Sequence, residues 1–262
     1  MKLFVDADYI VYKSCASCEY EIDYGNDVIV VASRFSDAMA AVERELKKLD
    51  IPFPFAEEKV LFFSGPENFR KKIDPDYKGH RNRKKPCGYK RVINELHTRY
   101  KVKIHQQLEA DDLLGIAATK YPGNVIVSPD KDMRQIPGEV YNMDETMSVT
   151  EEEGRRWHLI QTMAGDQTDG YAGVPGIGVK RAVTLMDKEG YNWKTVLGAF
   201  KKAGLTEDDA LRNARLAKIL TVDDYDSTKR EPILWCPSDA NDGADNGARP
   251  EDEADKGHTG EG

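Results

Sequence analysis

The sequence predicts an α/β protein with a mainly parallel sheet that is flanked by helices. Short buried strand patterns, such as KLFVD at 2–6 and KVLFFS at 59–64, alternate along the chain with amphipathic helical patterns. The 262 residues, of which 40% are hydrophobic, are enough to bury a large core. Because ligands of such sheets bind outside the carboxyl ends of the strands, we expect the functional residues there.

The remaining elements follow in order along the chain. Apolar residues at helical spacing predict a helix over 34–49, and a second helix over 88–99 follows a basic segment. The runs KVKIH at 101–105 and NVIVS at 124–128 are strand candidates on either side of a helix over 109–121. This alternation is typical of parallel strands joined by helical crossovers.

Two further helices are predicted in the second half. Thr150 and Glu153 form a capping box that opens a helix leading to Asp166. The glycine run GVPGIG over 173–178 then leads into a helix that begins near Val179.

Composition excludes several classes of protein. No apolar run approaches the roughly 20 residues of a membrane span, and acids occupy the N-terminus where a signal peptide would be apolar. We therefore expect a cytoplasmic protein, in the host cytoplasm if a phage encodes it, with no membrane partner. Cys15, Cys18, Cys87 and Cys236 are too few for a disulfide framework, and the single C-x-x-C lacks the second pair of a structural zinc site.

The formal charge of −8 is unevenly distributed. Residues 238–262 carry eight acids against two basic residues, and with so few apolar residues we expect this acidic tail to be disordered. Residues 70–103 carry thirteen Lys and Arg against three acids. Such a concentration is the footprint of a polyanion-binding surface, although a solvated basic face is the alternative.

Four sets of acids follow predicted strands or lie at helix ends. The sets are Asp6, with Asp8 beyond it; Glu109, Asp111 and Asp112; Asp130 and Asp132; and Asp166 and Asp169. Each set alone is ordinary, but together at one sheet edge they would repel one another unless divalent cations neutralised them. Oxygen ligands suit Mg²⁺ or Mn²⁺, and two such ions can stabilise both oxygens of a phosphodiester displacement. Because Asp166 and Asp169 oppose the dipole of the preceding helix, we also expect nearby basic groups.

The glycine run that follows these acids predicts a hairpin that holds a DNA backbone. Gly173, Gly176 and Gly178 allow unusual backbone angles or close approach, and Lys180 adds a positive charge. Amides at the start of a helix bind phosphate. A plain turn between helices is the alternative. No phosphate-binding loop of the type G-x-x-x-x-G-K-[ST] is present, so we expect no ATP dependence.

Five segments, in the same order up to about residue 220, resemble the 5′ nuclease family of bacteriophage 5′→3′ exonucleases, flap endonucleases and the 5′ nuclease domain of bacterial DNA polymerase I. They are FVDADYIVYKS, FRKKIDPDYKGHR, LEADDLLG, SPDKDM and MAGDQTDGYAGVPGIGVKRA. The resemblance implies a PIN-like nuclease domain over 1–150 with a basic arch segment over about 70–103. It further implies a helical DNA-binding lobe over 151–237 with a helix-hairpin-helix (helix-three-turn-helix), followed by the tail 238–262.

The resemblance also implies roles for individual residues. Asp6, Glu109, Asp111 and Asp112 would hold the first Mg²⁺ or Mn²⁺ ion, and Asp130, Asp132, Asp166 and Asp169 the second. Lys78 and Arg81 would contact the scissile phosphate and, with Asp130, serve catalysis. A K⁺ ion would lie at the hairpin. The DNA contacts would be Arg70, Tyr77, Lys78, Arg81, Arg83, Lys84, Lys85, Lys90, Gly173, Gly176, Gly178 and Lys180, with Tyr77 at the mouth and Tyr77 or Tyr89 stacking on a base.

The implied activity is that of a metal-dependent 5′→3′ exonuclease and flap endonuclease in DNA replication. Its partners would be duplex DNA with 5′ ends, nicks or flaps, RNA–DNA hybrids, and a replication protein bound through the acidic tail, and we expect a monomer. The alternatives are a PIN-type ribonuclease, which has no need of a duplex-binding hairpin, and a non-catalytic structure-specific DNA-binding relative.

The sequence departs from the family at one site. The family usually has an aspartate at the end of the second strand, where this chain has Phe63 and Ser64. We expect Asp8 or water to substitute, or the first ion to bind less tightly, and the remaining acids to suffice for activity.

Overall fold

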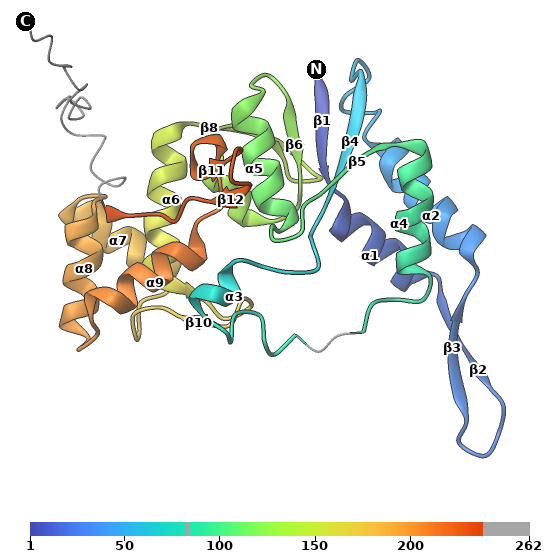
Figure 1. Cartoon of the computed structure of the whole chain (residues 1–262), viewed down its shortest axis with the longest axis horizontal. Coiled ribbons are helices and arrows are strands. Elements are labelled where there is room, and N and C mark those ends of the chain that lie inside the picture. Colours follow the sequence, from blue (N-terminus) through green and yellow to red (C-terminus); the bar gives the residue numbers. More distant parts are fainter. Residues whose placement is uncertain (82–83, 238–262) are drawn as a thin grey trace, which may run out of the picture.

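The computed structural model describes residues 1–81 and 84–237, so Arg83 and the acidic tail 238–262 lie outside the described residues. A central sheet separates two groups of helices, and a third group of helices packs at one end of the molecule (Figure 1). Within the described part, none of the helices has the length and apolar character of a membrane span.

The sheet has six strands in the order β5-β4-β1-β6-β7-β8. The strands are β1 (Lys2–Asp6), β4 (Glu58–Phe63), β5 (Lys101–Ile104), β6 (Val125–Val127), β7 (Gly138–Tyr141) and β8 (Thr146–Val149). All neighbours are parallel except β7 and β8, so the prediction of a mainly parallel sheet is confirmed. The predicted strands appear within a residue or two of their expected bounds, whereas β7 and β8 have no strong apolar run and are not predicted.

Helices cover both faces of the sheet because side chains alternate along each strand. Leu3 and Val5 of β1 face one layer of helices, and Phe4 faces the other. The first layer holds α1 (Ala7–Ser17), α2 (Phe35–Lys48) and α4 (Tyr89–Arg99). The second holds α5 (Ala110–Lys120) and the short helix η1 (Lys131–Gln135). Residues at the carboxyl ends of β1, β4 and β6 therefore lie between the two layers.

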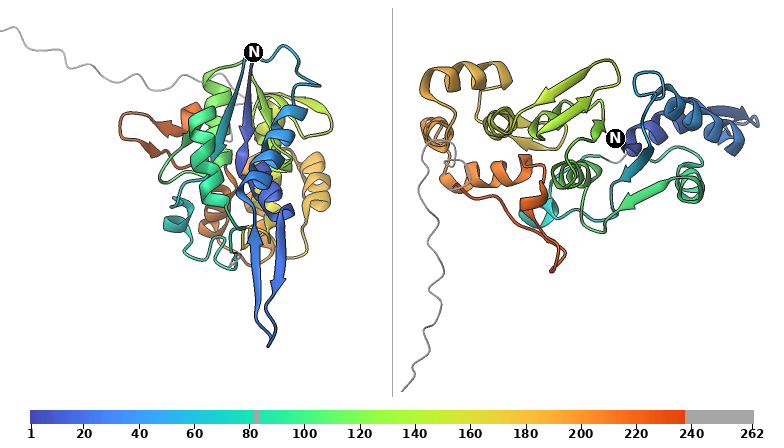
Figure 2. Two further views of the ribbon diagram at one scale, coloured as in Figure 1. Left: turned by 90° about the vertical axis from the view of Figure 1, so that its right-hand side faces the viewer. Right: turned by 90° about the horizontal axis from the view of Figure 1, so that it is seen from above.

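A second hydrophobic core joins the helices of the C-terminal half. These are α6 (Glu151–Ala164), α7 (Val179–Glu189), α8 (Trp193–Lys202) and α9 (Glu207–Ala217), which pack at one end of the molecule (Figure 2). The predicted capping box is confirmed, since Thr150 Oγ1 accepts from Glu153 N at 3.2 Å and Glu153 Oε2 accepts from Thr150 N at 2.8 Å. The helix expected near Val179 begins at that residue.

Short elements connect these layers. The hairpin of β2 (Glu19–Asp23) and β3 (Ile29–Ser33) projects from the α1 side (Figure 1). The two-residue strands β9 (Gly165–Asp166) and β10 (Tyr171–Ala172) follow α6, and β11 (Tyr225–Asp226) pairs with β12 (Glu231–Pro232). A single turn, α3 (Arg70–Ile73), and the short helix η2 (Val222–Asp224) complete the described elements. None of these hairpins is among the elements predicted from sequence.

Candidate active site

The sheet brings the first and third sets of acids together at its carboxyl edge. Asp6 ends β1, and its Oδ2 accepts from Ser128 Oγ, at the end of β6, at 2.9 Å. Asp130 follows β6 and caps η1, where its Oδ1 accepts from Asp132 N at 2.9 Å. Because β1 and β6 are neighbours, with Val5 opposite Val127, Asp6 and Asp130 lie on adjacent strand ends.

The start of α5 adds Asp111 to the same place. Burial raises the pKa of Asp111 well above its ordinary value, and the charges of Asp6 and Asp130 raise it further. Burial likewise raises the pKa of Asp6 to about 6, partly offset by the Ser128 bond and reinforced by Asp8 and Asp130. Within residues 1–81 and 84–237, no Lys or Arg forms an ion pair with Asp6, Asp111 or Asp130. We call these three carboxylates the acid-only group.

Asp112, although it follows Asp111 directly, has a different environment. Its side chain is fully buried, and its two oxygens accept from Arg70 Nη1 and Nη2 at 2.8 Å each. Leu220 N also donates to it at 3.2 Å. The structure thus places Asp112 in a buried ion pair rather than beside the acid-only group.

Arg70 is therefore not a DNA contact, and that prediction is wrong. Its guanidinium is only 3% exposed and is held by Asp112, by Glu109 Oε2 at 3.3 Å and by the backbone oxygen of Leu216 at 2.9 Å. The sequence places Arg70 in the basic segment, but α3 turns the side chain inward toward α5 and α9.

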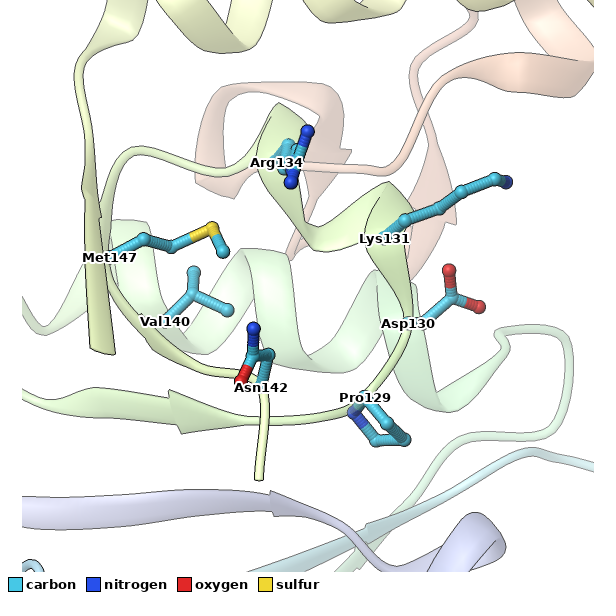
Figure 3. A pocket seen from close by; sticks show the side chains of 7 residues that line it. All are labelled: Pro129, Asp130, Lys131, Arg134, Val140, Asn142 and Met147. Carbon is cyan, nitrogen blue, oxygen red and sulfur yellow. The ribbon is translucent and has the colours of Figure 1, made fainter. Parts of the chain in front are cut away.

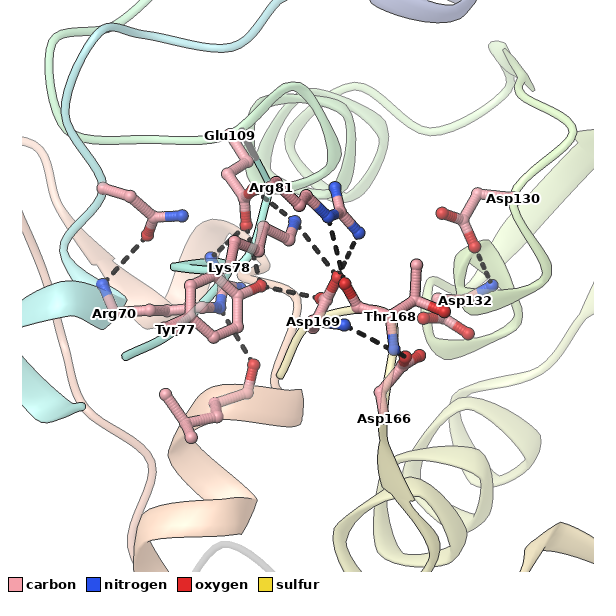
Figure 4. A network of polar contacts seen from close by, with 12 residues as sticks. Arg70, Tyr77, Lys78, Arg81, Glu109, Asp130, Asp132, Asp166, Thr168 and Asp169 are labelled. Carbon is pink, nitrogen blue, oxygen red and sulfur yellow. Dashed lines mark hydrogen bonds and ion pairs between the residues drawn. The ribbon is translucent and has the colours of Figure 1, made fainter. Parts of the chain in front are cut away.

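Tyr77 also differs from its prediction. Its side chain is 2% exposed, and its hydroxyl lies 2.8 Å from Asp169 Oδ2 and 3.1 Å from Glu109 Oε2 (Figure 4). It links the α5 acids to those after α6, and it cannot stack on a base at the mouth. Tyr89 is buried too, with its hydroxyl donating to Asp8 Oδ1 at 2.6 Å.

The basic segment contributes two side chains to this side of the site. Lys78 Nζ lies 2.5 Å from Glu109 Oε1 and 3.5 Å from Asp169 Oδ1. Arg81 Nη2 donates to Asp169 Oδ1 at 2.7 Å (Figure 4). Burial would raise the pKa of Glu109, but Lys78 and Arg70 lower it to about 2. We call Glu109, Asp112 and Asp169, with their basic partners, the ion-paired group.

The last pair of acids is held by a turn and a lysine. Asp166 Oδ1 accepts from Thr168 N at 2.7 Å and from Asp169 N at 3.2 Å. Lys131 Nζ lies 2.8 Å from Asp132 Oδ1 and 3.5 Å from Asp166 Oδ2. The expectation that basic groups compensate Asp166 and Asp169 is confirmed. Sequence reasoning missed Lys131 and Ser128, although both lie within the segment SPDKDM that carries Asp130 and Asp132.

The backbone of Lys78 is unusual for a residue with a side chain. Its φ is 54°, in the left-handed region that favours glycine, and its N–H donates to Asp169 O at 2.7 Å. Strained backbone of this kind persists where the surroundings fix it, often at functional sites. The main chain and the side chain of Lys78 are thus both tied to the hairpin that carries Asp169.

A small pocket gives solvent access to Asp130. It lies between η1 and the β7–β8 strands (Figure 3). It is lined by Pro129, Asp130, Lys131, Arg134, Val140, Asn142 and Met147.

The donor chemistry of the site fits hard divalent cations. In this arrangement no three Asp, Glu, His or Cys side chains of the described chain converge closely enough to hold a metal. However, the acid-only group consists of mutually repelling carboxylates, and Lys78 and Lys131 each bridge two acids as a bound cation would. Carboxylate oxygens with room for water suit Mg²⁺ or Mn²⁺.

Two of the three glycines singled out in the turn between α6 and α7 meet the prediction. Gly176 has φ 77°, and a Cβ on Gly173 would lie 2.2 Å from Ala164 C, so both positions require glycine. Gly178 has no such requirement, since it precedes α7 in extended backbone with open space. Lys180 is exposed on α7, and Lys84, Lys85 and Lys90 are exposed before and at the start of α4.

Acids at the carboxyl edge of a mainly parallel sheet, beside a basic segment and a glycine turn, are typical of a metal-dependent nuclease. Residues 2–159 match the family model described as 5′–3′ exonuclease, N-terminal resolvase-like domain, and this chain belongs to that family. It is a nuclease of the phage 5′–3′ exonuclease type.

Named relatives support the same family. The chain is 27% identical to the exodeoxyribonuclease of Enterobacteria phage T3, covering 90% of this chain and 92% of that protein. It is 28% identical to the exonuclease of Escherichia phage T7, covering 90% and 93%. Among solved structures, T5 5′-exonuclease with bound zinc aligns with a TM-score of 0.62 at 16% identity, covering 82% of this chain and 88% of that one. A T5 flap endonuclease variant, in a pseudo-enzyme-product complex with DNA and metal ions, aligns with a TM-score of 0.60 at 14% identity, covering 83% and 88%.

Proposed function

We propose that this protein is a divalent-metal-dependent 5′→3′ exonuclease and structure-specific flap endonuclease that hydrolyses phosphodiester bonds of DNA. The observation that carries the proposal is the acid-only group, in which Asp6, Asp111 and Asp130 gather at the ends of β1 and β6 and form no ion pair with a Lys or Arg of the described chain. Asp6 is buried and Asp111 is partly buried, and carboxylates in such surroundings ionise fully only beside a cation. The metal ions and DNA named for the T5 structures support the same reading.

The acids divide between two ions of Mg²⁺ or Mn²⁺. The resemblance implied Asp6, Glu109, Asp111 and Asp112 for the first ion, and Asp130, Asp132, Asp166 and Asp169 for the second. We revise this assignment in two places: Asp130 joins the first ion, because it follows the strand next to Asp6, and Asp112 is not a ligand, because Arg70 occupies both of its oxygens. Asp112 holds Arg70 in place through their ion pair, and Arg70 in turn contacts Glu109. When bound, two such ions stabilise the attacking and leaving oxygens of an in-line displacement at phosphorus.

The chain's own basic residues bind and orient the substrate. The scissile phosphate would replace carboxylate as the partner of Lys78 and Arg81, whose side chains already lie at the acids. These cations then stabilise the charge that develops on the phosphate oxygens. Lys84, Lys85, Lys90 and Arg83 would follow the strand backbone. The amides of the 173–178 turn and Lys180 would hold the duplex, with K⁺ at the turn.

An assay on labelled substrates tests the proposal. The intact protein is incubated with 5′-flap, nicked duplex and RNA–DNA hybrid substrates and with single-stranded RNA, each with Mg²⁺ or with EDTA. We expect Mg²⁺-dependent release of 5′-phosphate products from flaps and nicks, and also cleavage of the RNA in hybrids. Cleavage confined to single-stranded RNA would show a PIN-type ribonuclease, and binding without cleavage would show a non-catalytic relative.

A second test separates catalysis from duplex binding. In Arg81→Gln, the loss of one charged donor at the scissile phosphate should lower kcat about 10²-fold. The Kd for nicked duplex, measured in EDTA, should change only a few-fold, because many phosphate contacts share the binding energy. Lys84→Gln, which removes an exposed charge farther along the basic segment, is the matched control and should affect mainly the Kd. Equal losses in kcat and affinity for Arg81→Gln would contradict the assigned role.

A further inference from the structure

Among the adjacent strands β4, β1 and β6, β4 alone has no acid at its end or within the next three residues. Its neighbour β1 ends in Asp6, and β6, on the other side of β1, is followed by Asp130. β4 ends in Phe63, followed by Ser64 and Gly65. The carboxylates are therefore unevenly spread across three adjacent strand ends.

Asp8 places a carboxylate at this gap. Asp6 pairs with Phe62 across the two strands, so Asp8 and Ser64 each lie two residues beyond that pair. Asp8 Oδ2 accepts from Ser64 N at 2.8 Å, and the negative charge of Asp8 is close enough to act on Asp6. Asp8 thus reaches across from the first turn of α1 to the end of β4.

The contacts of Asp8 leave its charge available. Its two oxygens accept from Ser64 N and from Tyr89 O–H, but each carboxylate oxygen can accept more than one bond. The side chain is half-buried, and no Lys or Arg among residues 1–81 and 84–237 forms an ion pair with it. Two neutral donors thus fix the position of Asp8 and leave its charge uncompensated.

We propose that Asp8 is a positioning residue for the first divalent ion, and that it supplies at the end of β4 the negative charge that Ser64 lacks. The inference rests on the proposed metal-dependent function of the acid-only group. A carboxylate just outside the ligands orients them and raises affinity, and loss of such a group typically weakens metal binding about 10- to 100-fold.

The test measures Mn²⁺ binding to the intact chain, by calorimetry and by the paramagnetic resonance of free Mn²⁺, without substrate. Asp8→Asn keeps the shape and removes the charge, and we expect Mn²⁺ affinity to fall by about 10-fold or more. Asp37→Asn, which removes an exposed acid from the first turn of α2, controls for the helix dipole and should leave affinity unchanged. Tyr89→Phe removes one bond to Asp8 but keeps the charge, and it should change affinity by no more than about 3-fold.

The decisive variant moves the charge back onto β4. In Asp8→Asn/Ser64→Asp the new carboxylate lies at the exposed position that Asp8 now contacts, and it can still accept from Ala110 N as Ser64 Oγ does. We expect it to restore affinity to within about 3-fold of the unsubstituted protein. A purely structural role would lower the melting temperature in EDTA for Asp8→Asn, and Ser64→Asp would not rescue Mn²⁺ binding.

Two results would overturn the inference: unchanged Mn²⁺ affinity in Asp8→Asn, or no recovery in the double variant. Failure of the proposed function looks different, because the unsubstituted protein would then bind no Mn²⁺ and cleave no flap in Mg²⁺. If the unsubstituted protein binds Mn²⁺ and cleaves, and Asp8→Asn does both equally well, only the role of Asp8 is wrong.

Discussion

Asp111 and Asp112 are adjacent in the sequence, yet they belong to opposite halves of the site. Asp112, in the ion-paired group, has a guanidinium 2.8 Å from each of its oxygens. Asp111, in the acid-only group, meets the charges of Asp6 and Asp130. One residue along α5 turns the side chain by about 100°, which is enough to exchange a basic neighbour for acidic ones.

The contrast separates Asp112, whose ion pair stabilises the fold, from Asp111, which is available to bind a cation. A buried acid with a bidentate arginine is part of the structure, because loss of either partner leaves a buried charge. Acids that lie close together without an ion-pair partner destabilise the fold once ionised, and an exchangeable cation relieves that repulsion. The following predictions test this division, beginning with the largest effect.

The largest effect is expected from Asp130→Ala, in the acid-only group. Loss of this carboxylate should lower cleavage of nicked or flapped DNA on the order of 10³-fold, because the charge stabilisation at phosphorus depends on the ions. The Kd for the same DNA, measured in EDTA, should stay within about 3-fold, since phosphate contacts elsewhere provide binding. Asp144→Ala removes an exposed acid from the β7–β8 turn and should leave both quantities unchanged. Equal losses of DNA binding and cleavage in Asp130→Ala would show that the acid-only group does not act specifically in catalysis.

In the ion-paired group the expected effect is on stability. Arg70→Met leaves Asp112 buried without its partner, and the free energy of unfolding should fall by about 3 to 5 kcal/mol. Urea denaturation in EDTA measures it. Arg70→Met/Asp112→Leu removes both charges and should recover most of the loss. A single variant that loses less than about 1 kcal/mol would show that the pair is not structural.

The two groups should also respond to pH with opposite signs. The pKa of Asp6 is raised, chiefly by burial, from 3.8 to about 6, so its contribution to stability is present below pH 3.8 and is lost as pH rises through 6. The pKa of Glu109 is lowered from 4.5 to about 2 by Lys78 and Arg70 against the effect of burial. Its contribution is therefore present above pH 4.5 and is lost as pH falls through 2.

Urea denaturation of Asp6→Asn and Glu109→Gln in EDTA tests these signs. At pH 7, Asp6→Asn should raise the free energy of unfolding by roughly 1 to 3 kcal/mol, and the gain should vanish near pH 4. Glu109→Gln should be destabilised at pH 7. If both substitutions shift stability in the same direction at pH 7, the division into two groups fails.

The sequence predicts most of the strands and the acids of the site, because both are recognised from short stretches of neighbouring residues. Buried apolar runs identify β1, β4 and β6. Asp6 ends β1, and Asp130 follows the end of β6 by three residues. The β2–β3 hairpin has a local signal in its turn, where Asn26 and Asp27 both have positive φ, because Asn and Asp adopt this conformation more readily than most residues. β9 and β10, at two residues each, are too short for any periodicity.

The hydrogen-bond and ion-pair partners of the acids cannot be predicted from local sequence, because they are far away along the chain. Arg70 and Asp112 are 42 residues apart, and Tyr77 and Asp169 are 92 apart. Because Arg70 and Tyr77 lie in a basic segment, the sequence places them at a nucleic-acid surface. In the structure, α3 and the loop after it pack against α5, α9 and the β9–β10 hairpin, and this packing turns both side chains inward. The site acids were therefore predictable, but their division into two groups was not.

The smallest effect is expected at Lys131, which bridges Asp132 and Asp166 at the margin between the two groups. Its side chain is 58% exposed, so water and salt screen both ion pairs, and such pairs contribute about 0 to 1 kcal/mol. Lys131→Gln should leave the free energy of unfolding nearly unchanged.

Metal binding should respond more than stability does. The ammonium of Lys131 competes with divalent cations for Asp132 and Asp166. Its removal in Lys131→Gln should therefore tighten Mn²⁺ binding a few-fold at low salt, and the difference should shrink at high salt. Calorimetric titration at two salt concentrations measures it, with Lys194→Gln on α8 as the control. Weaker Mn²⁺ binding in Lys131→Gln would instead show that Lys131 orders Asp132 and Asp166 for the ion. Lys131 and these two acids would then belong to the ion-paired group.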